Sequence, residues 1–213
     1  MKNRTNLTKY RILAPVYDHL IGRRIFRAAR QRALALLGIG PSDRVLLVGV
    51  GTGEDLAFLP PATKAVGIDL AEAMLEVARA KFPTVELRLM NAERLEYPDA
   101  SFDKVVLNLV LSVVENPKQA LTEALRVLKP EGSVVVFDKF LPAGEKPSLA
   151  RRAFNVFTSW LGTDINRRFD EISRGLPLET ILDEPSLFGG SYRILLLGKA
   201  RQPVTRIEAT SHQ

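Results

Sequence analysis

From residue 43 onward, short apolar runs alternate with longer amphipathic stretches. The apolar runs are rich in Val, Ile and Leu and predict strands over residues 44–50, 64–68, 85–90, 104–107 and 133–137. Their nearly continuous apolar character is typical of strands covered on both faces. The stretches between them predict helices over 71–82 and 117–129, the second one capped by Asn116 and begun by Pro117. This alternation predicts a parallel sheet with crossover helices.

Both ends of the chain depart from this alternation. Residues 5–38 predict two helices with an apolar stripe made by Ile21, Ile25, Ala29, Ala33, Leu36 and Leu37. Residues 147–176 predict a helical insertion, and residues 193–199 a last strand that pairs antiparallel after a turn at Gly189 and Gly190. We therefore expect one domain over 1–200, with 1–38 as an N-terminal helical cap, and a disordered polar tail over 201–213.

Composition narrows the class of protein. The chain has no cysteine and two histidines, so we expect neither a disulfide framework nor a metal centre. No apolar run approaches the roughly 20 residues of a membrane-spanning helix, and the first residues lack the apolar core of a signal peptide. These features predict a cytoplasmic protein without a transmembrane segment.

Positive charge is concentrated at the start of the chain. The whole chain has a net charge of +6, but residues 1–32 alone carry nine Lys and Arg against Asp18, a net charge of +8. Within this segment Arg23, Arg27 and Arg30 share one face of the second predicted helix. The pattern predicts either a solvated helix face or contact with an anionic partner, which is a lipid surface or nucleic acid.

A glycine-rich loop follows the first predicted strand. Gly49, Gly51 and Gly53 are spaced to allow a sharp turn and a close approach of backbone to a ligand. Glu54 stands where the dinucleotide-binding fingerprint has its last glycine. An acidic pair, Glu54 and Asp55, would repel a pyrophosphate but suits a cofactor that carries a sulfonium and an ammonium.

Asp69 strengthens the interpretation of this loop. It ends the second predicted strand, twenty positions after Gly49, where a carboxylate can accept hydrogen bonds from both ribose hydroxyls of an adenosyl group. It can also cap the helix predicted over 71–82, and the two roles are compatible.

Longer stretches carry a family resemblance over about residues 9–199. The runs VLLVGVGTG, AVGIDLAEAMLEVAR, LMNAERLEYPDASFDKVVLNLVLSVVENP and LTEALRVLKPEGSVVVFDKF resemble the class I S-adenosylmethionine-dependent methyltransferases in order and spacing. The resemblance implies an α/β fold with a doubly wound, mostly parallel seven-stranded, Rossmann-like sheet. Within that family the chain is similar to bacterial phosphatidylethanolamine N-methyltransferases in KYRILAPVYDHL, FLPPATKAVGID and SVVENP. The ubiquinone and menaquinone C-methyltransferases form the nearest competing branch.

The resemblance assigns roles to ten residues. It implies that S-adenosylmethionine is held by Gly49, Gly51 and Gly53 around its methionine part, by Asp69 at the ribose, and by Leu70, Met74, Asn91 and Ala92 around the adenine. It places Asn108 beside the sulfonium and the substrate, and Tyr17 in the N-terminal element that closes over the cofactor. Leu47 and Asn91 depart from the family, which has acidic residues there, and this implies weaker cofactor binding. Asn91 retains a carbonyl acceptor.

These features lead to a functional hypothesis and an alternative. The hypothesis is N-methylation of the amine headgroup of phosphatidylethanolamine, in phospholipid biosynthesis at the inner membrane face, with Tyr17 and Asn108 as catalytic residues. Tyr17, Asp18 and His19 are candidates for deprotonating the amine. The alternative is C- or O-methylation of a quinone or other small acceptor. A nucleic-acid methyltransferase is disfavoured because NLVL stands in place of an Asn-Pro-Pro-Tyr motif, and a dinucleotide-binding module is disfavoured by Glu54.

Overall fold

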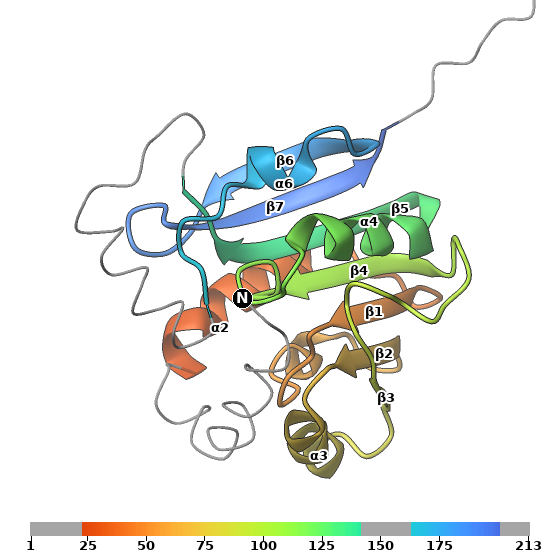
Figure 1. Ribbon diagram of the computed structural model, residues 1–213. Helices are drawn as coiled ribbons and strands as arrows, with labels where there is room; N and C mark the ends of the chain where they lie inside the picture. Colours follow the sequence, from red (N-terminus) through yellow and green to blue (C-terminus); the bar gives the residue numbers. More distant parts are fainter. Residues whose placement is uncertain (1–22, 142–162, 201–213) are drawn as a thin grey trace, which may run out of the picture.

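The protein is built on one seven-stranded sheet. The computed structural model describes residues 23–141 and 163–200 (Figure 1). The strands are β1 (Arg44–Val48), β2 (Lys64–Asp69), β3 (Glu86–Leu89), β4 (Phe102–Asn108), β5 (Leu128–Lys139), β6 (Leu178–Pro185) and β7 (Tyr192–Lys199). Their spatial order is β3-β2-β1-β4-β5-β7-β6, parallel except for the antiparallel pairs β5–β7 and β6–β7. The doubly wound, mostly parallel sheet is confirmed.

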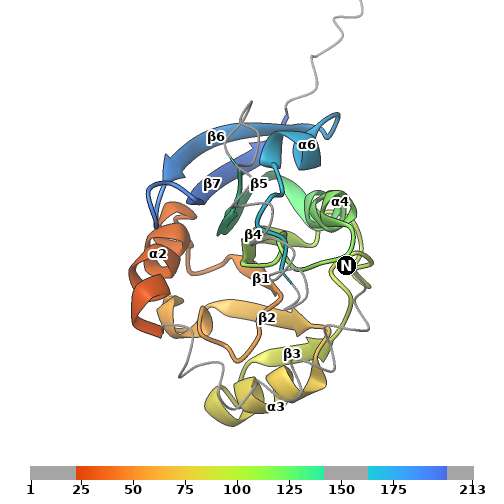
Figure 2. The same cartoon turned by 60° about the vertical axis from the view of Figure 1, so that its left-hand side comes forward.

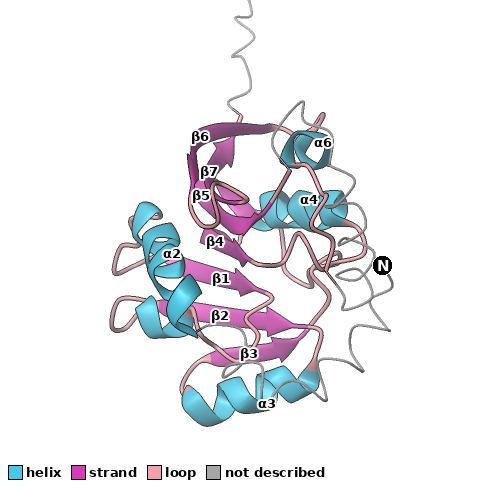
Figure 3. Ribbon diagram, turned by 90° about the vertical axis from the view of Figure 1, so that its left-hand side faces the viewer, coloured by secondary structure: helices cyan, strands magenta, loops and turns pink. Residues whose placement is uncertain are grey.

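Helices cover both faces of this sheet. They are α2 (Arg23–Leu36), α3 (Glu72–Lys81), α4 (Pro117–Val127) and α6 (Phe169–Ser173), with a 3-10 turn at Leu56–Phe58. Helices α2 and α3 lie on one face, and α4 and α6 lie on the other (Figure 2 and Figure 3). Helix α4 begins as its sequence predicts, because the side chain of Asn116 accepts a hydrogen bond from the backbone N–H of Gln119 at 3.0 Å.

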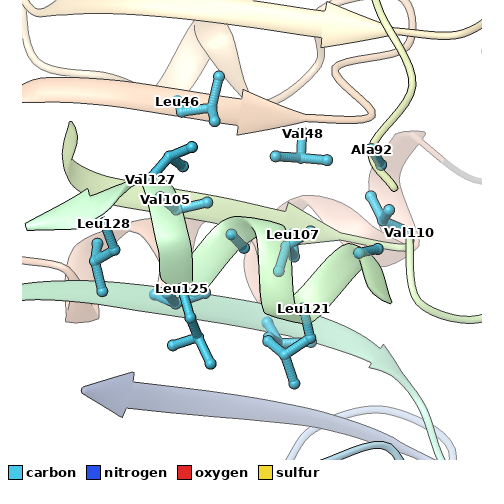
Figure 4. Packing of buried hydrophobic residues seen from close by; sticks show 14 of the residues in the cluster. Leu46, Val48, Ala92, Val105, Leu107, Val110, Leu121, Leu125, Val127 and Leu128 are labelled. Carbon is cyan, nitrogen blue, oxygen red and sulfur yellow. The ribbon is translucent and has the colours of Figure 1, made fainter. Parts of the chain in front are cut away.

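The core has two halves, one on each face of the sheet, and alternate side chains of each central strand pack into them. In β1, Val45 and Leu47 pack towards α2, whereas Leu46 and Val48 pack on the opposite face. Leu121 and Leu125 of α4, with Val105 and Leu107 of β4, belong to that second half, part of which Figure 4 shows. The central strands are therefore buried on both faces, as their continuous apolar runs predict.

An ion pair between buried Glu123 and partly exposed Arg126 fixes the loop that follows β3. Glu123 of α4 accepts a hydrogen bond from the backbone N–H of Leu95 at 2.7 Å, and Arg126 donates to the carbonyls of Leu95 and Tyr97 at 2.9 and 2.8 Å. The guanidinium also binds the carboxylate of Glu123 and lowers its pKa. Since residues 91 and 92 begin this loop, α4 holds one side of the pocket described below.

Three sequence-based expectations of burial and helix content were wrong. Strand β3 is largely exposed, because it is the sheet's edge and only one neighbour pairs with it. Ile25 is 53% exposed, because α2 packs through Phe26, Ala29, Ala33 and Leu37, a stripe that starts one residue later. In the described part of the predicted insertion, only residues 169–173 are helical.

Strand boundaries also differ from those predicted. β5 extends from 128 to 139, beyond the predicted 133–137, and β6 was not predicted at all. Strand β6 lies at the edge of the sheet and has most of its residues exposed, so its sequence contains several charged residues. It therefore lacks the apolar run by which the other strands were predicted. The first predicted helix, Ile21 and the tail over 201–213 lie outside the described residues. No helix in the described ranges is long and apolar enough to cross a membrane.

Candidate active site

The glycine loop has the backbone that its sequence predicts. Gly49, Gly51 and Gly53 all have positive φ angles, of 65°, 55° and 86°. A Cβ at Gly49 would lie 2.6 Å from the side chain of Val110, so the loop packs directly against the turn after β4. A Cβ at Gly51 would meet no atom within 4 Å, because this residue borders a pocket.

Asp69 ties the glycine loop to the end of β2. Its carboxylate accepts hydrogen bonds from the backbone N–H groups of Gly51 and Ala71, both at 2.9 Å. Burial raises its pKa, and these backbone hydrogen bonds oppose the shift. Each carboxylate oxygen accepts one of these bonds and keeps a further lone pair. The interpretation of Asp69 as a helix cap was wrong, because the N-cap of α3 is Ala71 and Asp69 binds the backbone N–H of that residue. Asp69 retains acceptor capacity for a ligand.

One pocket lies at the carboxyl ends of β1, β2 and β4, where the strand order reverses. Most of the expected site residues line it: Gly49, Gly51, Asp69, Leu70, Met74, Asn91, Ala92 and Asn108. Gly53 does not line it, because its Cα faces the ring of Phe82, which a Cβ would approach to 2.9 Å. Tyr17, Asp18 and His19 lie outside the described residues. The structure therefore brings together residues from four separate parts of the sequence.

The two departures from the family pattern have different consequences. Leu47 is buried in the α2 half of the core and does not line the pocket. Asn91 does line the pocket, and its side-chain carbonyl accepts a hydrogen bond from the backbone N–H of Glu93 at 2.9 Å. That carbonyl oxygen still has a second lone pair for an adenine amine.

A buried polar chain joins α2 to the pocket. Arg30 of α2 donates to Asp55 at 2.6 Å, and Asp55 accepts a second hydrogen bond from the side-chain amide of Asn108 at 3.0 Å. Arg30 therefore points inward, with its side chain 17% exposed, and does not belong to a solvated basic face. No pattern in the sequence indicates that Arg30 and Asp55 are partners. The acidic pair that follows Gly53 was the feature of the sequence that could have marked Asp55 as a residue of the site.

A second polar cluster supports the turn over residues 110–114. Asp138, at the end of β5, is fully buried and accepts a hydrogen bond from the backbone N–H of Ser112 at 2.9 Å. Burial raises the pKa of Asp138 and lowers the pKa of its neighbour Lys139. From the other side, Arg167 donates to the carbonyls of Leu111 and Val114. Sequence reasoning missed Asp138, because a single acid at the end of a strand carries no recognisable pattern.

Arg167 and Arg168 both have partners within the protein. The guanidinium of Arg167 is bound to the backbone of residues 111 and 114, and burial lowers its pKa. Arg168 pairs with Asp170 at 2.8 Å. Within residues 23–141 and 163–200, no three acidic, His or Cys side chains converge on a point that suits a metal ion.

Comparison with known proteins gives the family. Residues 46–136 match the methyltransferase domain family. The chain is 33% identical over 188 residues to a phosphatidylethanolamine N-methyltransferase of Cereibacter sphaeroides, covering 84% of this chain and 91% of that one. With this match and the pocket at the switch point, the chain belongs to the class I S-adenosylmethionine-dependent methyltransferases.

Other relatives act on different acceptors. A demethylmenaquinone methyltransferase of Tropheryma whipplei is 39% identical over 111 residues, covering 50% of this chain and 46% of that one. A ubiquinone/menaquinone biosynthesis C-methyltransferase of Geobacter sulfurreducens is 31% identical, covering 68% of this chain and 60% of that one. The chain thus spans about half the length of the demethylmenaquinone relative.

Solved structures agree with the fold. A possible histamine N-methyltransferase of Thermotoga maritima superimposes with a TM-score of 0.66 at 21% identity, covering 92% of this chain and 100% of that one. A geranyl diphosphate C-methyltransferase of Streptomyces coelicolor, determined with S-adenosyl-L-homocysteine, gives a TM-score of 0.69 at 16% identity, covering 83% of this chain and 81% of that one. The protein is an S-adenosylmethionine-dependent enzyme, and the open cradle at Gly51 and the spare lone pairs of Asp69 fit that cofactor.

Proposed function

We propose that the protein N-methylates the amine headgroup of phosphatidylethanolamine at a membrane surface. The observation that carries this proposal is the extent of the match to the Cereibacter sphaeroides enzyme, which covers 91% of that protein. The matches to quinone methyltransferases cover 46% and 60% of those proteins. Segments outside the cofactor half commonly select the acceptor, so a match along nearly the whole relative favours its substrate class.

The pocket residues divide into groups with distinct roles. In this proposal the loop of Gly49, Gly51 and Gly53 borders the methionine part of the cofactor, and Asp69 accepts hydrogen bonds from the ribose hydroxyls. The apolar side chains Leu70 and Met74, together with Asn91 and Ala92, surround the adenine. Asn108, at the end of β4, faces the reacting centre, and Tyr17 closes over the cofactor. Eight of these ten residues line the pocket.

The chemistry requires alignment more than acid–base machinery. S-adenosylmethionine supplies a methyl group already activated by a sulfonium, so the protein's task is to orient the acceptor and exclude water. A protonated amine must first lose a proton, because its nitrogen otherwise has no lone pair. The apolar wall of Val110, Val113 and Val114 borders the pocket and favours the neutral amine over the ammonium.

Contact with the membrane is assigned to the basic start of the chain. Residues 1–32 carry a net charge of +8, Arg27 is exposed on α2, and Ile25 beside it is 53% exposed. A basic helix with an exposed apolar residue binds anionic lipid surfaces, and each basic residue near such a surface contributes about 1 kcal/mol. We expect Arg27→Gln to reduce flotation with anionic vesicles. The matched control Lys64→Gln, which removes an exposed charge from β2, should leave it unchanged.

Quinone methylation is the second candidate, favoured by the 39% identity to the Tropheryma whipplei enzyme over 111 residues. One experiment separates the two. The protein is incubated with methyl-labelled S-adenosylmethionine and a total bacterial lipid extract, with Asp69→Ala as the inactive control. Label in mono- or dimethylated phosphatidylethanolamine or in phosphatidylcholine supports the proposal. Label in the neutral quinone fraction alone would overturn it in favour of the alternative.

A further inference from the structure

Asn108 holds a buried acceptor that the protein itself does not use. It is the last residue of β4, lines the pocket and is 4% exposed. Its amide nitrogen donates to Asp55 at 3.0 Å, whereas its carbonyl oxygen is buried and accepts no hydrogen bond from any residue in the described ranges. Buried acceptors in native proteins are nearly always paired, so this oxygen marks a place where a ligand that donates a hydrogen bond belongs.

Asp55 decides which end of the amide is left for that ligand. A carboxylate only accepts hydrogen bonds, so the side of Asn108 that faces it must be the NH₂ group. Asp55 is itself held in place, because it is 4% exposed and its second oxygen accepts from Arg30 at 2.6 Å. Rotating the amide of Asn108 by half a turn would bring its carbonyl against the carboxylate. The carbonyl is therefore fixed on the other side.

We propose that Asp55, held by Arg30, is a positioning residue that presents the Asn108 carbonyl to the N–H of an amine acceptor. This inference rests on the proposed function, because it needs an acceptor whose reacting atom is nitrogen. A neutral primary or secondary amine has both an N–H and a lone pair. When the N–H donates to Asn108 Oδ1, the direction of the lone pair is restricted, which favours one line of approach to the methyl carbon.

The same geometry distinguishes successive methylations. Phosphatidylethanolamine and its monomethyl derivative, as neutral amines, carry an N–H that Asn108 can bind. The dimethyl derivative is a tertiary amine without one. The first two methylations therefore depend on the orientation of Asn108, and the third does not. A merely structural role of Asp55 would affect all three alike, because it would act through the shape of the site.

The first test examines the geometry without any reaction. In ¹⁵N-labelled protein the side-chain amide signal of Asn108 is identified by its loss in Asn108→Ala. We expect it to shift in Asp55→Asn, which no longer dictates the orientation of the amide, and to stay in place in Glu54→Gln, its neighbour in the loop. A signal that Asp55→Asn leaves unchanged would overturn the proposal.

The second test compares three lipids as acceptors. Asp55→Asn should lower kcat for phosphatidylethanolamine and its monomethyl derivative by about tenfold, the effect of one hydrogen bond on a rate. With the dimethyl derivative it should stay within about twofold of wild type, as should the cofactor KM with every lipid. Equal losses with all three lipids would overturn the proposal, because they would indicate a general distortion of the site.

A swapped pair provides the rescue. In the double variant Asp55→Asn with Asn108→Asp, the amide at 55 donates to the carboxylate at 108, whose other oxygen still accepts from the amine. We expect the double variant to exceed Asn108→Asp alone, which sets two carboxylates against each other, in kcat on phosphatidylethanolamine. If the double variant loses the sum of the two single variants' losses in log kcat, the proposal is contradicted. If the wild type methylates none of the three lipids, the proposed function fails and the amine part of the inference fails with it, while the amide signal still reports separately on the contact of Asp55 with Asn108.

Discussion

The pocket has two walls that are stabilised in different ways. The β1–β2 wall is formed by the glycine loop over residues 49–53, of which Gly53 does not line the pocket, and by residues 69–71. The β4–β5 wall is the turn over residues 110–114, which Asp138 and Arg167 hold by hydrogen bonds without lining the pocket themselves. The first wall is joined by backbone hydrogen bonds to one short side chain, Asp69, within about one βαβ unit. The second depends on contacts from far along the chain, such as those from Arg167 to residues 111 and 114.

We propose that this difference separates recognition of the cofactor from recognition of the acceptor. The β1–β2 wall needs particular residue types at fixed spacing, because its positive φ angles and its carboxylate leave little choice. The β4–β5 wall needs only that distant groups meet, and many sequences can provide that. We infer that the first wall is shared by relatives with different acceptors, whereas the second can vary with the acceptor.

The substitution expected to have the largest effect lies in the β1–β2 wall. Asp69→Ala removes the acceptor of two backbone hydrogen bonds and of the proposed ribose contacts. We expect the Kd for S-adenosylmethionine, measured by calorimetry, to rise about a hundredfold or more, since two hydrogen bonds to a charged group are lost. Asp183→Ala, which removes an exposed carboxylate of β6 that pairs with Arg193, is the matched control and should bind normally. Normal cofactor binding by Asp69→Ala would sink the assignment of this wall.

The substitution expected to have the next largest effect lies in the β4–β5 wall. Arg167→Met leaves the carbonyls of Leu111 and Val114 without their donor. We expect the free energy of unfolding in urea to fall by about 3 kcal/mol, because two partly buried carbonyl groups lose a charged donor. The free energy of unfolding of Arg167→Lys should lie between those of Arg167→Met and wild type, because an ammonium lacks the planar group that reaches both carbonyls. Arg168→Met, which loses the ion pairs with Asp170 and Glu171, should remain near wild type. Equal losses at 167 and 168 would contradict the role given to Arg167.

A pair of glycine substitutions examines the contact between the walls. Gly49→Ala places a Cβ 2.6 Å from Val110 at a positive φ, whereas Gly51→Ala has the same backbone strain without a neighbour. We expect the free energy of unfolding to fall by about 2 kcal/mol or more for Gly49→Ala and by about 1 kcal/mol for Gly51→Ala. Gly51→Ala should mainly weaken cofactor binding, because its methyl group enters the pocket. Thermal or urea unfolding beside calorimetry checks both, and equal destabilisation would argue against packing of the loop on Val110.

The smallest effect concerns the pH dependence of the β4–β5 wall. Burial raises the pKa of Asp138 above the ordinary value of 3.8. The stabilising contribution of this group is therefore fully present below the unfolded pKa and is lost as pH rises through the folded pKa, by about 1.4 kcal/mol for each unit of difference. We expect the stability of wild type relative to Asp138→Asn to decrease as pH rises from 4 to 7. If the stability of wild type relative to Asp138→Asn is constant or rises with pH, burial does not raise the pKa of Asp138.

Sequence patterns were most informative where local chemistry decides the structure. The apolar runs located the parallel strands, Asn116 marked the start of α4, and the glycine spacing predicted the loop that Asp69 joins. The same patterns failed at the edges of the sheet. Strand β3 alternates the charged residues Glu86 and Arg88 with leucines and is largely exposed, so it was wrongly expected to be covered on both faces. Strand β6 likewise carries the charges of an exposed edge.

Motif order and spacing indicated the family, the cofactor and eight of the residues that line the pocket. They could do so because a backbone with positive φ angles favours glycine, and the proposed ribose contact needs a carboxylate at the end of β2. Three contacts became visible in the folded protein alone: Arg30 of α2 points inward to Asp55, Asp55 binds the amide of Asn108, and Asp138 and Arg167 converge on one turn. Those contacts join residues that lie 25 to 53 positions apart in the sequence. They depend on how the layers pack, since hydrogen bonds between distant side chains form only after the sheet and its helices have brought them together.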